Sequence, residues 1–101
     1  MIILNVWYAC KPGTRDEVLK LAKDCVDNSR LEEGNLGYGQ YPVPDSEDDI
    51  FVCEVWESKE ALAKHSQAEH YKKFGEARKP YAVPGTFKIK AYEAEPTKIA
   101  L

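Results

Sequence analysis

Both histidines of the chain, His65 and His70, lie in one short segment that also carries Glu54, Trp56 and Phe74. The segment joins an apolar strand to a helical region, so these side chains can gather around one pocket. An imidazole titrates near neutral pH and can both accept and donate a proton, which suits general acid–base chemistry. The residue types therefore predict a proton-transfer site with aromatic walls. The alternative is that His70 is a partly buried histidine that packs between helices.

The spacing of the two histidines argues against a metal site. On an unbroken helix, five positions leave the two rings about 140° apart around the axis. A zinc pair on a helix needs a spacing of four, and no cysteine stands beside either histidine. We therefore expect no metal ion. The segment Ser66-Gln67-Ala68-Glu69 has the pattern of a capping box, so a second helix should start there. A break at Ser66 would let both rings converge on one cavity.

The predicted break also separates the roles of the two rings. His65 ends the first helix, where the negative end of the helix dipole favours a protonated imidazole. His70 falls in the first turn of the second helix, where the positive end favours the neutral form that accepts a proton. On this argument His70 is the better base, and His65 is the better hydrogen-bond donor to a developing oxyanion.

Two further polar residues stand in strands that are otherwise apolar, Asn5 and Glu54. A buried amide or carboxylate needs a hydrogen-bond partner. Asn5 can bond to a neighbouring backbone group, or it can aim its amide into a cavity and orient a carbonyl or phenolic oxygen. Glu54 can pair with a lysine or a second subunit, or it can belong to the same pocket.

The elements that position these residues follow from periodicity and turn signals. The sequence predicts four strands, with a helix between the first and second and a broken helix between the third and fourth. The predicted strands are 2–9, 36–42, Ile50–Glu57 and Thr86–Ala94; the first helix begins at a Thr14–Glu17 capping box and ends at Glu33-Gly34-Asn35; the second helical region follows Ser58. This order, β-α-β-β-α-β, predicts a ferredoxin-like α+β fold, with an antiparallel sheet and helices on one face. We expect one domain over 1–101, with a core of 2–94 and a tail of 95–101.

The sheet should have a second apolar face that the helices cannot cover. Phe51, Cys53 and Val55 alternate with an equally apolar row, and Trp7 stands opposite Val6 and Tyr8. An exposed apolar face of this size is unusual in a monomer. We therefore expect a homodimer that buries it. The alternative is an open face whose few large residues surround a ligand.

Composition excludes several classes of partner. The chain has 101 residues and a net charge of −3, without the basic stripe of a nucleic-acid-binding protein or the basic run that an anionic membrane attracts. Its first residues resemble a strand rather than a signal peptide, and no apolar run is long enough to span a bilayer. Three scattered cysteines, Cys10, Cys25 and Cys53, fit reduced thiols in a cytoplasmic protein. No phosphate-binding glycine loop or nucleophile elbow is present.

One pattern of residues spans positions 34 to 74: Gly34-Asn35, Tyr38, Phe51-x-x-Glu54-x-Trp56-Glu57-Ser58, Leu62-x-x-His65, His70 and Phe74. This pattern resembles the antibiotic biosynthesis monooxygenase domain family of dimeric α+β barrels. The resemblance implies pocket positions at Asn5, Trp56, His65, His70 and Phe74. The haem-degrading members carry a tryptophan where His65 stands and a haem-ligating histidine near Phe74-Gly75. Since this chain departs at both places, haem degradation is not expected.

What the resemblance implies is a cofactor-independent monooxygenase that oxidises a small electron-rich aromatic, such as a quinol, with O2. His70, His65 and Asn5 are the expected catalytic residues, and the expected substrate-binding residues are Trp56, Tyr38, Phe74 and Glu54. Two alternatives use the same pocket. One is an isomerase of a small carbonyl metabolite, and the other is a non-catalytic dimer that binds small molecules or acts in a stress response.

Overall fold

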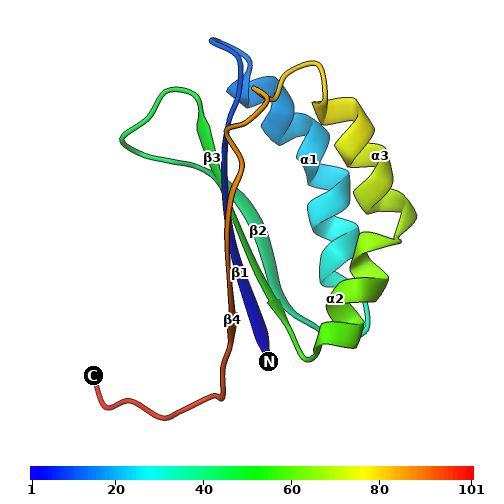
Figure 1. Ribbon diagram of the computed structural model, residues 1–101, viewed down its shortest axis with the longest axis vertical. Coiled ribbons are helices and arrows are strands. Elements are labelled where there is room, and N and C mark those ends of the chain that lie inside the picture. The colour runs from blue at the N-terminus through cyan, green and yellow to red at the C-terminus, as the bar shows by residue number, and fades with distance from the viewer.

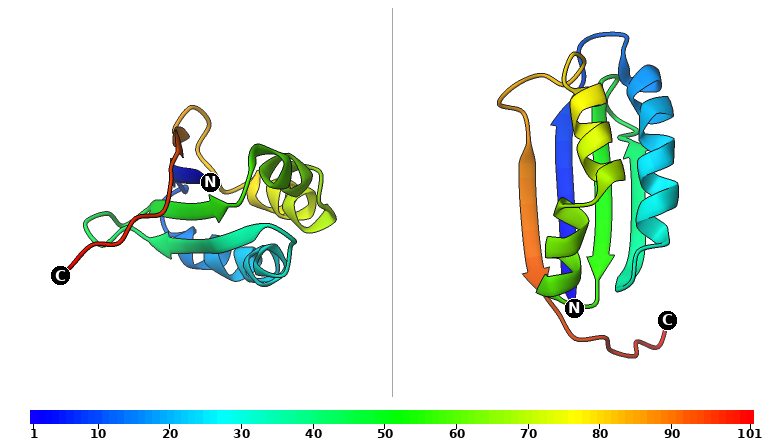
Figure 2. Two further views of the ribbon diagram at one scale, coloured as in Figure 1. Left: turned by 90° about the horizontal axis from the view of Figure 1, so that it is seen from below. Right: turned by 90° about the vertical axis from the view of Figure 1, so that its right-hand side faces the viewer.

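The fold is a four-stranded antiparallel sheet with three helices packed on one face (Figure 1). The computed structural model describes all residues from 1 to 101. The elements, in chain order, are β1 (Ile2–Ala9), α1 (Arg15–Arg30), β2 (Asn35–Pro42), β3 (Asp49–Trp56), α2 (Lys59–Ser66), α3 (Glu69–Arg78) and β4 (Lys88–Glu93). The strand order across the sheet is β2-β3-β1-β4, and the helices lie in front of the sheet in the right-hand view of Figure 2. The predicted ferredoxin-like topology is confirmed.

The central strands β1 and β3 pair over their full length, from Ile2 opposite Trp56 to Ala9 opposite Asp49. Because side chains alternate along a strand, every second residue faces the helices. On β3 this row contains Ile50, Val52, Glu54 and Trp56, which are all buried. The helix-facing row therefore places one carboxylate and one indole inside an otherwise apolar core.

Helix α1 packs on β2 and beside α3, and its buried face contains Val18, Ala22, Cys25 and Ser29. Its predicted capping box does not form. The Thr14 hydroxyl donates to the carbonyl of Lys11 at 2.7 Å, so it does not accept from the first turn. The turn before the helix uses this hydroxyl. The acidic residues in the first turn still interact favourably with the positive end of the helix dipole.

The chain breaks between α2 and α3, as the sequence predicts, but for a different reason. The Ser66 hydroxyl donates backward to the carbonyl of Ala63, so Ser66 caps no new helix. Helix α3 begins after Ala68, whose extended backbone (φ −68°, ψ 143°) makes the turn without a side-chain cap. The predicted capping box at Ser66 is therefore wrong, whereas the expected pair of short helices is confirmed.

The other face of the sheet carries no helix (Figure 1). We call it the open face; its residues alternate with the buried rows and include Ile3, Asn5, Trp7, Tyr41, Phe51, Cys53, Val55, Lys88, Lys90 and Tyr92. Trp7 and Phe51 pack against each other with ring centroids 5.2 Å apart. Tyr41 and Tyr92 are about half exposed, at 50% and 49%.

We propose that the open face is the interface of a homodimer, since a partner would remove this apolar surface from water. Trp7→Glu would place a charge in that interface and should convert the dimer to a monomer. The matched control is Leu31→Glu, because Leu31 is 82% exposed and lies outside the open face. Sedimentation velocity at micromolar concentration measures both. A monomeric wild type, or dissociation by the control, would contradict the proposal.

Candidate functional site

One carboxylate oxygen lies between the two histidines. Oε2 of Glu32 is 2.6 Å from Nδ1 of His65 and 2.8 Å from Nε2 of His70. The three residues come from three places: the turn after α1, the last turn of α2 and the first turn of α3. The two imidazole rings are 6.0 Å apart between centroids. The break between α2 and α3 thus brings the rings together, and the turn after α1 supplies the group that joins them.

The Glu32 carboxylate determines which nitrogen of His65 carries the proton. An ionised carboxylate only accepts hydrogen bonds, so Nδ1 of His65 must be the donor. In the neutral ring, Nε2 then holds a lone pair. This atom has no hydrogen-bond partner, although the His65 side chain is only 2% exposed. The arrangement therefore leaves one buried, unpartnered proton acceptor.

Glu54 lies close to this acceptor but does not bond to it. Its Oε1 is 3.7 Å from Nε2 of His65 and accepts a hydrogen bond of 3.0 Å from Nε1 of Trp56. Burial raises the pKa of the Glu54 carboxyl, while the Trp56 hydrogen bond and the nearby His65 partly offset the increase. A proton added to His65 would thus have Glu32 on one side and Glu54 on the other.

Aromatic rings surround His65. Ring centroids of Trp56, Tyr71 and Tyr38 lie 4.7, 4.9 and 5.4 Å from that of the imidazole. Tyr38 is fixed by hydrogen bonds, since its hydroxyl accepts from Nε2 of Gln40 and lies 3.7 Å from the Cys25 sulfur. Burial raises the pKa of Tyr38, which keeps its hydroxyl protonated. The surroundings are therefore apolar and hold the imidazole in one orientation.

A cavity of about 150 Å³ lies beside His65, between the helices and the sheet. Most of its wall is apolar. The residues that line it are Leu4, Val6, Tyr38, Gln40, Val52, Glu54, Leu62, His65, Ser66, Tyr71, Phe74, Arg78, Phe87 and Ile89. Among the predicted site residues, Tyr38, Glu54, His65 and Phe74 belong to this wall. His70 and Trp56 contact His65 or its partners from behind the wall.

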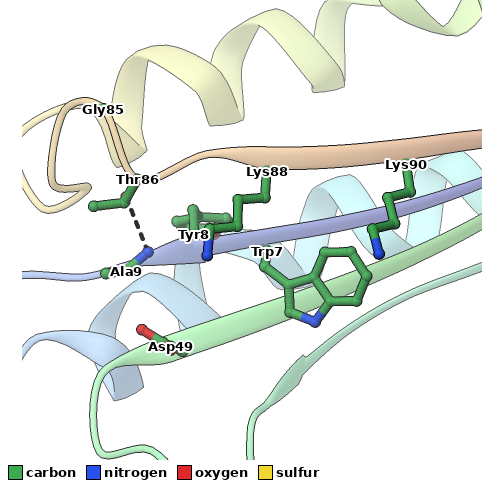
Figure 3. A pocket seen from close by; sticks show the side chains of 8 residues that line it. All are labelled: Trp7, Tyr8, Ala9, Asp49, Gly85, Thr86, Lys88 and Lys90. Carbon is green, nitrogen blue, oxygen red and sulfur yellow. Dashed lines mark hydrogen bonds between the residues drawn. The ribbon is translucent and has the colours of Figure 1, made fainter.

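Asn5 is not brought together with the histidines. It pairs in register with Cys53 and Lys90, so its side chain lies on the open face, across the sheet from His65. A larger hollow of about 620 Å³ lies on the open face, where Trp7, Lys88 and Lys90 line it (Figure 3). This hollow is separated from the imidazoles by the sheet. This geometry therefore does not support a joint action of Asn5 and the histidines within one chain.

Comparison with known proteins assigns the chain to a family. The sequence profile described as antibiotic biosynthesis monooxygenase matches residues 1–77. The chain belongs to the antibiotic biosynthesis monooxygenase family. A relative in Bacillus subtilis (strain 168), YcnE, is provisionally named a monooxygenase; it is 32% identical over 74 residues, which are 73% of this chain and 78% of YcnE.

Solved structures agree with this family fold. A Bacteroides thetaiotaomicron protein of unknown function, described as a possible oxidoreductase, has a TM-score of 0.82 at 26% identity, with 92% of this chain and 96% of that one covered. A Deinococcus radiodurans structure, provisionally described as an antibiotic biosynthesis monooxygenase, has a TM-score of 0.87 at 20% identity and covers 100% of this chain and 99% of its own. In the present member of the family, no helix is long and apolar enough to cross a membrane.

In this antibiotic biosynthesis monooxygenase family member, Glu32 is the residue that sequence reasoning missed. It lies far from both histidines in the chain, and the only nearby signal is Gly34, which follows it. Glu32, His65 and His70 place donor atoms within 4.8 Å of one another, a set that could hold a divalent metal ion. Direct hydrogen bonds from both histidines already go to Oε2 of Glu32, and the expected absence of a metal stays a prediction.

Gly34 holds the turn that carries Glu32 against α2. Its φ is +86°, and a Cβ built there would lie 2.6 Å from Cβ of Ala61. We expect Gly34→Ala to lower the free energy of unfolding by about 1–3 kcal/mol more than Gly13→Ala does. Gly13 is the matched control, because it also has a positive φ (+78°) but nothing near a built Cβ. Urea unfolding measures both. Equal losses of unfolding free energy in the two variants would show that the close packing of Gly34 on α2 does not contribute to stability.

Glu54 should make stability depend on pH. Because its folded-state pKa lies above the unfolded-state value, protonated Glu54 adds to stability at acidic pH, and this contribution is lost as the pH rises through the folded-state pKa. Glu54→Gln stays neutral and can still accept from Trp56. Its stability relative to wild type should therefore increase as the pH rises above the ordinary range of a carboxyl. Urea unfolding measures the difference in the free energy of unfolding between Glu54→Gln and the wild type. A difference that does not vary with pH would contradict this assignment.

Proposed function

We propose that this protein is a monooxygenase that oxidises a small, electron-rich aromatic of the quinol type with O2 and needs neither metal nor flavin. Membership of the antibiotic biosynthesis monooxygenase family supports monooxygenase chemistry in general. The single observation that carries the finer proposal is the unpartnered Nε2 of His65, buried in the wall of an apolar cavity. A base without a partner in a residue that lines a cavity can take a proton from a hydroxyl bound there.

The first step is proton transfer. A ring hydroxyl of the substrate gives its proton to Nε2 of His65, and the O–H electron pair stays on the substrate oxygen. The imidazolium that forms is stabilised by the Glu32 carboxylate at Nδ1, as in catalytic sites where a carboxylate fixes a histidine tautomer. The apolar wall excludes water from the resulting anion.

The second step consumes O2. The electron-rich anion reduces O2, one oxygen atom bonds to a ring carbon, and the other leaves as water. The balance is quinol plus O2 giving hydroxyquinone plus water, so the substrate supplies all four electrons. The protons released from the ring return through His65 to the departing oxygen. No step draws electrons from the protein.

His65 and His70 have different roles in this proposal. The helix-dipole argument favours His70 as the base, but His70 does not line the cavity, whereas His65 does. We therefore assign proton abstraction to His65. His70 acts through Glu32, whose carboxylate it holds at 2.8 Å, so His70 and Glu32 are positioning residues.

The decisive experiment is O2 uptake with a panel of quinols. We expect His65→Ala to lower turnover by at least ~10²-fold, the low end for loss of a general base. His70→Ala should reduce turnover less and should shift the pH–rate profile, because Glu32 loses one of its two donors. Sedimentation checks that both variants keep the oligomeric state of the wild type.

A chelator provides the control for a metal-dependent reaction. Uptake should be unchanged by EDTA, because the proposed chemistry uses only the imidazole and the carboxylates. Loss of activity with EDTA and its return with a divalent ion would overturn the metal-free mechanism. An active His65→Ala variant with an unaltered pH–rate profile would overturn the assignment of the base.

A further inference from the structure

The cavity beside His65 limits the size of its ligand. Its volume is about 150 Å³, which is the size of an engineered apolar cavity that binds one benzene molecule. One aromatic ring therefore fits this volume, which favours monocyclic members of the quinol class.

Arg78 adds a second polar group to the same wall. Its guanidinium carbon lies 4.9 Å from the ring centroid of Tyr8, 4.8 Å from that of Phe74 and 5.1 Å from that of Phe87. Tyr8 and Phe87 are themselves stacked, with centroids 4.7 Å apart. Three ring faces thus hold the planar cation in position through cation–π attraction.

No carboxylate lies within ion-pair distance of Arg78. The ion pairs of the structure join other residues, and Arg78 is absent from all of them. It is the only lysine or arginine that lines the cavity. A half-buried guanidinium without an anionic partner keeps its capacity for a strong, two-pronged bond to a carboxylate.

The other ionisable groups of the wall are compatible with an anionic ligand. Glu54 is the only acidic side chain that lines the cavity, and its buried carboxyl favours the neutral form more than an exposed one does. Burial raises the pKa of Tyr38, so its phenol adds no negative charge to the wall. Glu32 lies outside the wall and is bonded to both histidines.

His65 and Arg78 belong to two separate aromatic groups of the wall. His65 lies among Trp56, Tyr38 and Tyr71, whereas Arg78 lies among Tyr8, Phe74 and Phe87. A ring between them can present a hydroxyl to the imidazole and an acidic substituent to the guanidinium. A substrate with one hydroxyl and no acid would leave Arg78 unused.

We infer that the substrate is a monocyclic hydroxylated aromatic acid, a dihydroxybenzoate, with a ring hydroxyl at Nε2 of His65 and its carboxylate on Arg78. This inference rests on the proposed function for the role of His65, and it adds the acidic substituent and the single ring. It also makes Arg78 the residue that sets specificity.

Anaerobic binding tests the inference without turnover. The probes are 2,5-dihydroxybenzoate and its neutral isostere 2,5-dihydroxybenzamide, titrated by calorimetry into the wild-type protein. We expect the acid to bind at least about tenfold more tightly than the amide, as a charge-assisted hydrogen bond requires. Equal affinities would overturn the inference, and because both probes meet the intact protein, no folding defect can obscure the result.

Variants then show which residue causes the preference for the acid over the amide. Arg78→Met keeps an apolar stem against the three rings and should bring the two affinities to within about threefold, whereas Arg78→Lys should keep part of the preference. Lys79→Met is the matched control, since Lys79 is the adjacent cation, directly after the end of α3, and is 76% exposed; it should leave the preference unchanged. A preference that survives Arg78→Met would contradict the assignment. Tight binding of 1,4-dihydroxy-2-naphthoate would contradict the single-ring limit.

Aerobic assays separate this inference from the proposed function. Acid-selective, Arg78-dependent binding without O2 uptake would refute the oxygenase and leave the binding site standing. O2 uptake that is equally fast with hydroquinone and with the dihydroxybenzoate at subsaturating concentration would leave the oxygenase standing and refute the role of Arg78.

Discussion

The arrangement of the site depends on one oxygen atom, Oε2 of Glu32, which accepts from both imidazoles. This shared acceptor fixes the orientation of both rings and requires the proton of neutral His65 to sit on Nδ1. The opposite nitrogen, Nε2, is then left buried and without a hydrogen-bond partner in a residue that lines the cavity. Without the carboxylate, the ring could rotate or change tautomer, and the cavity would contain no defined acceptor.

The backbone brings these three groups together through two local features. The positive φ of Gly34 and its close approach to Ala61 hold the turn with Glu32 against α2. The extended backbone at Ala68 ends α2 just after His65 and redirects the chain so that His70 faces back toward it. Neither feature is part of the chemistry, yet both determine the distances within it.

The sequence predicted the topology well because strand alternation and turn residues report directly on local structure. The helix-facing row of β3, with Glu54 among apolar residues, could be predicted from period-two alternation alone. The two capping boxes were wrong because the hydroxyls of Thr14 and Ser66 donate to nearby carbonyls in competition with capping. A capping pattern shows that a hydroxyl is able to cap a helix, but the surrounding turn determines whether it does.

The site was predictable only in part, because its central contact joins residues far apart in the chain. The helix break predicted that His65 and His70 converge on one cavity; their rings lie 6.0 Å apart, but only His65 lines the cavity. Glu32 could not be predicted, since nothing in one sequence indicates that the end of α1 meets α2 and α3. Asn5 shows the converse: its polar side chain suggested a pocket, but the alternation of β1 places it on the open face. The dipole argument that favoured His70 considered each helix alone and could not show which ring borders the cavity.

The most direct test of this account is the tautomer of His65, which ¹⁵N NMR of the imidazole nitrogens reports at a pH where the ring is neutral. The account predicts a proton on Nδ1 of His65 and a free Nε2, with the opposite tautomer, Nε2–H, at His70. In Glu32→Gln, the preference of His65 for Nδ1–H should weaken or vanish. A proton on Nε2 of His65 in the wild-type protein would contradict the account, because the nitrogen proposed as the base could then accept nothing.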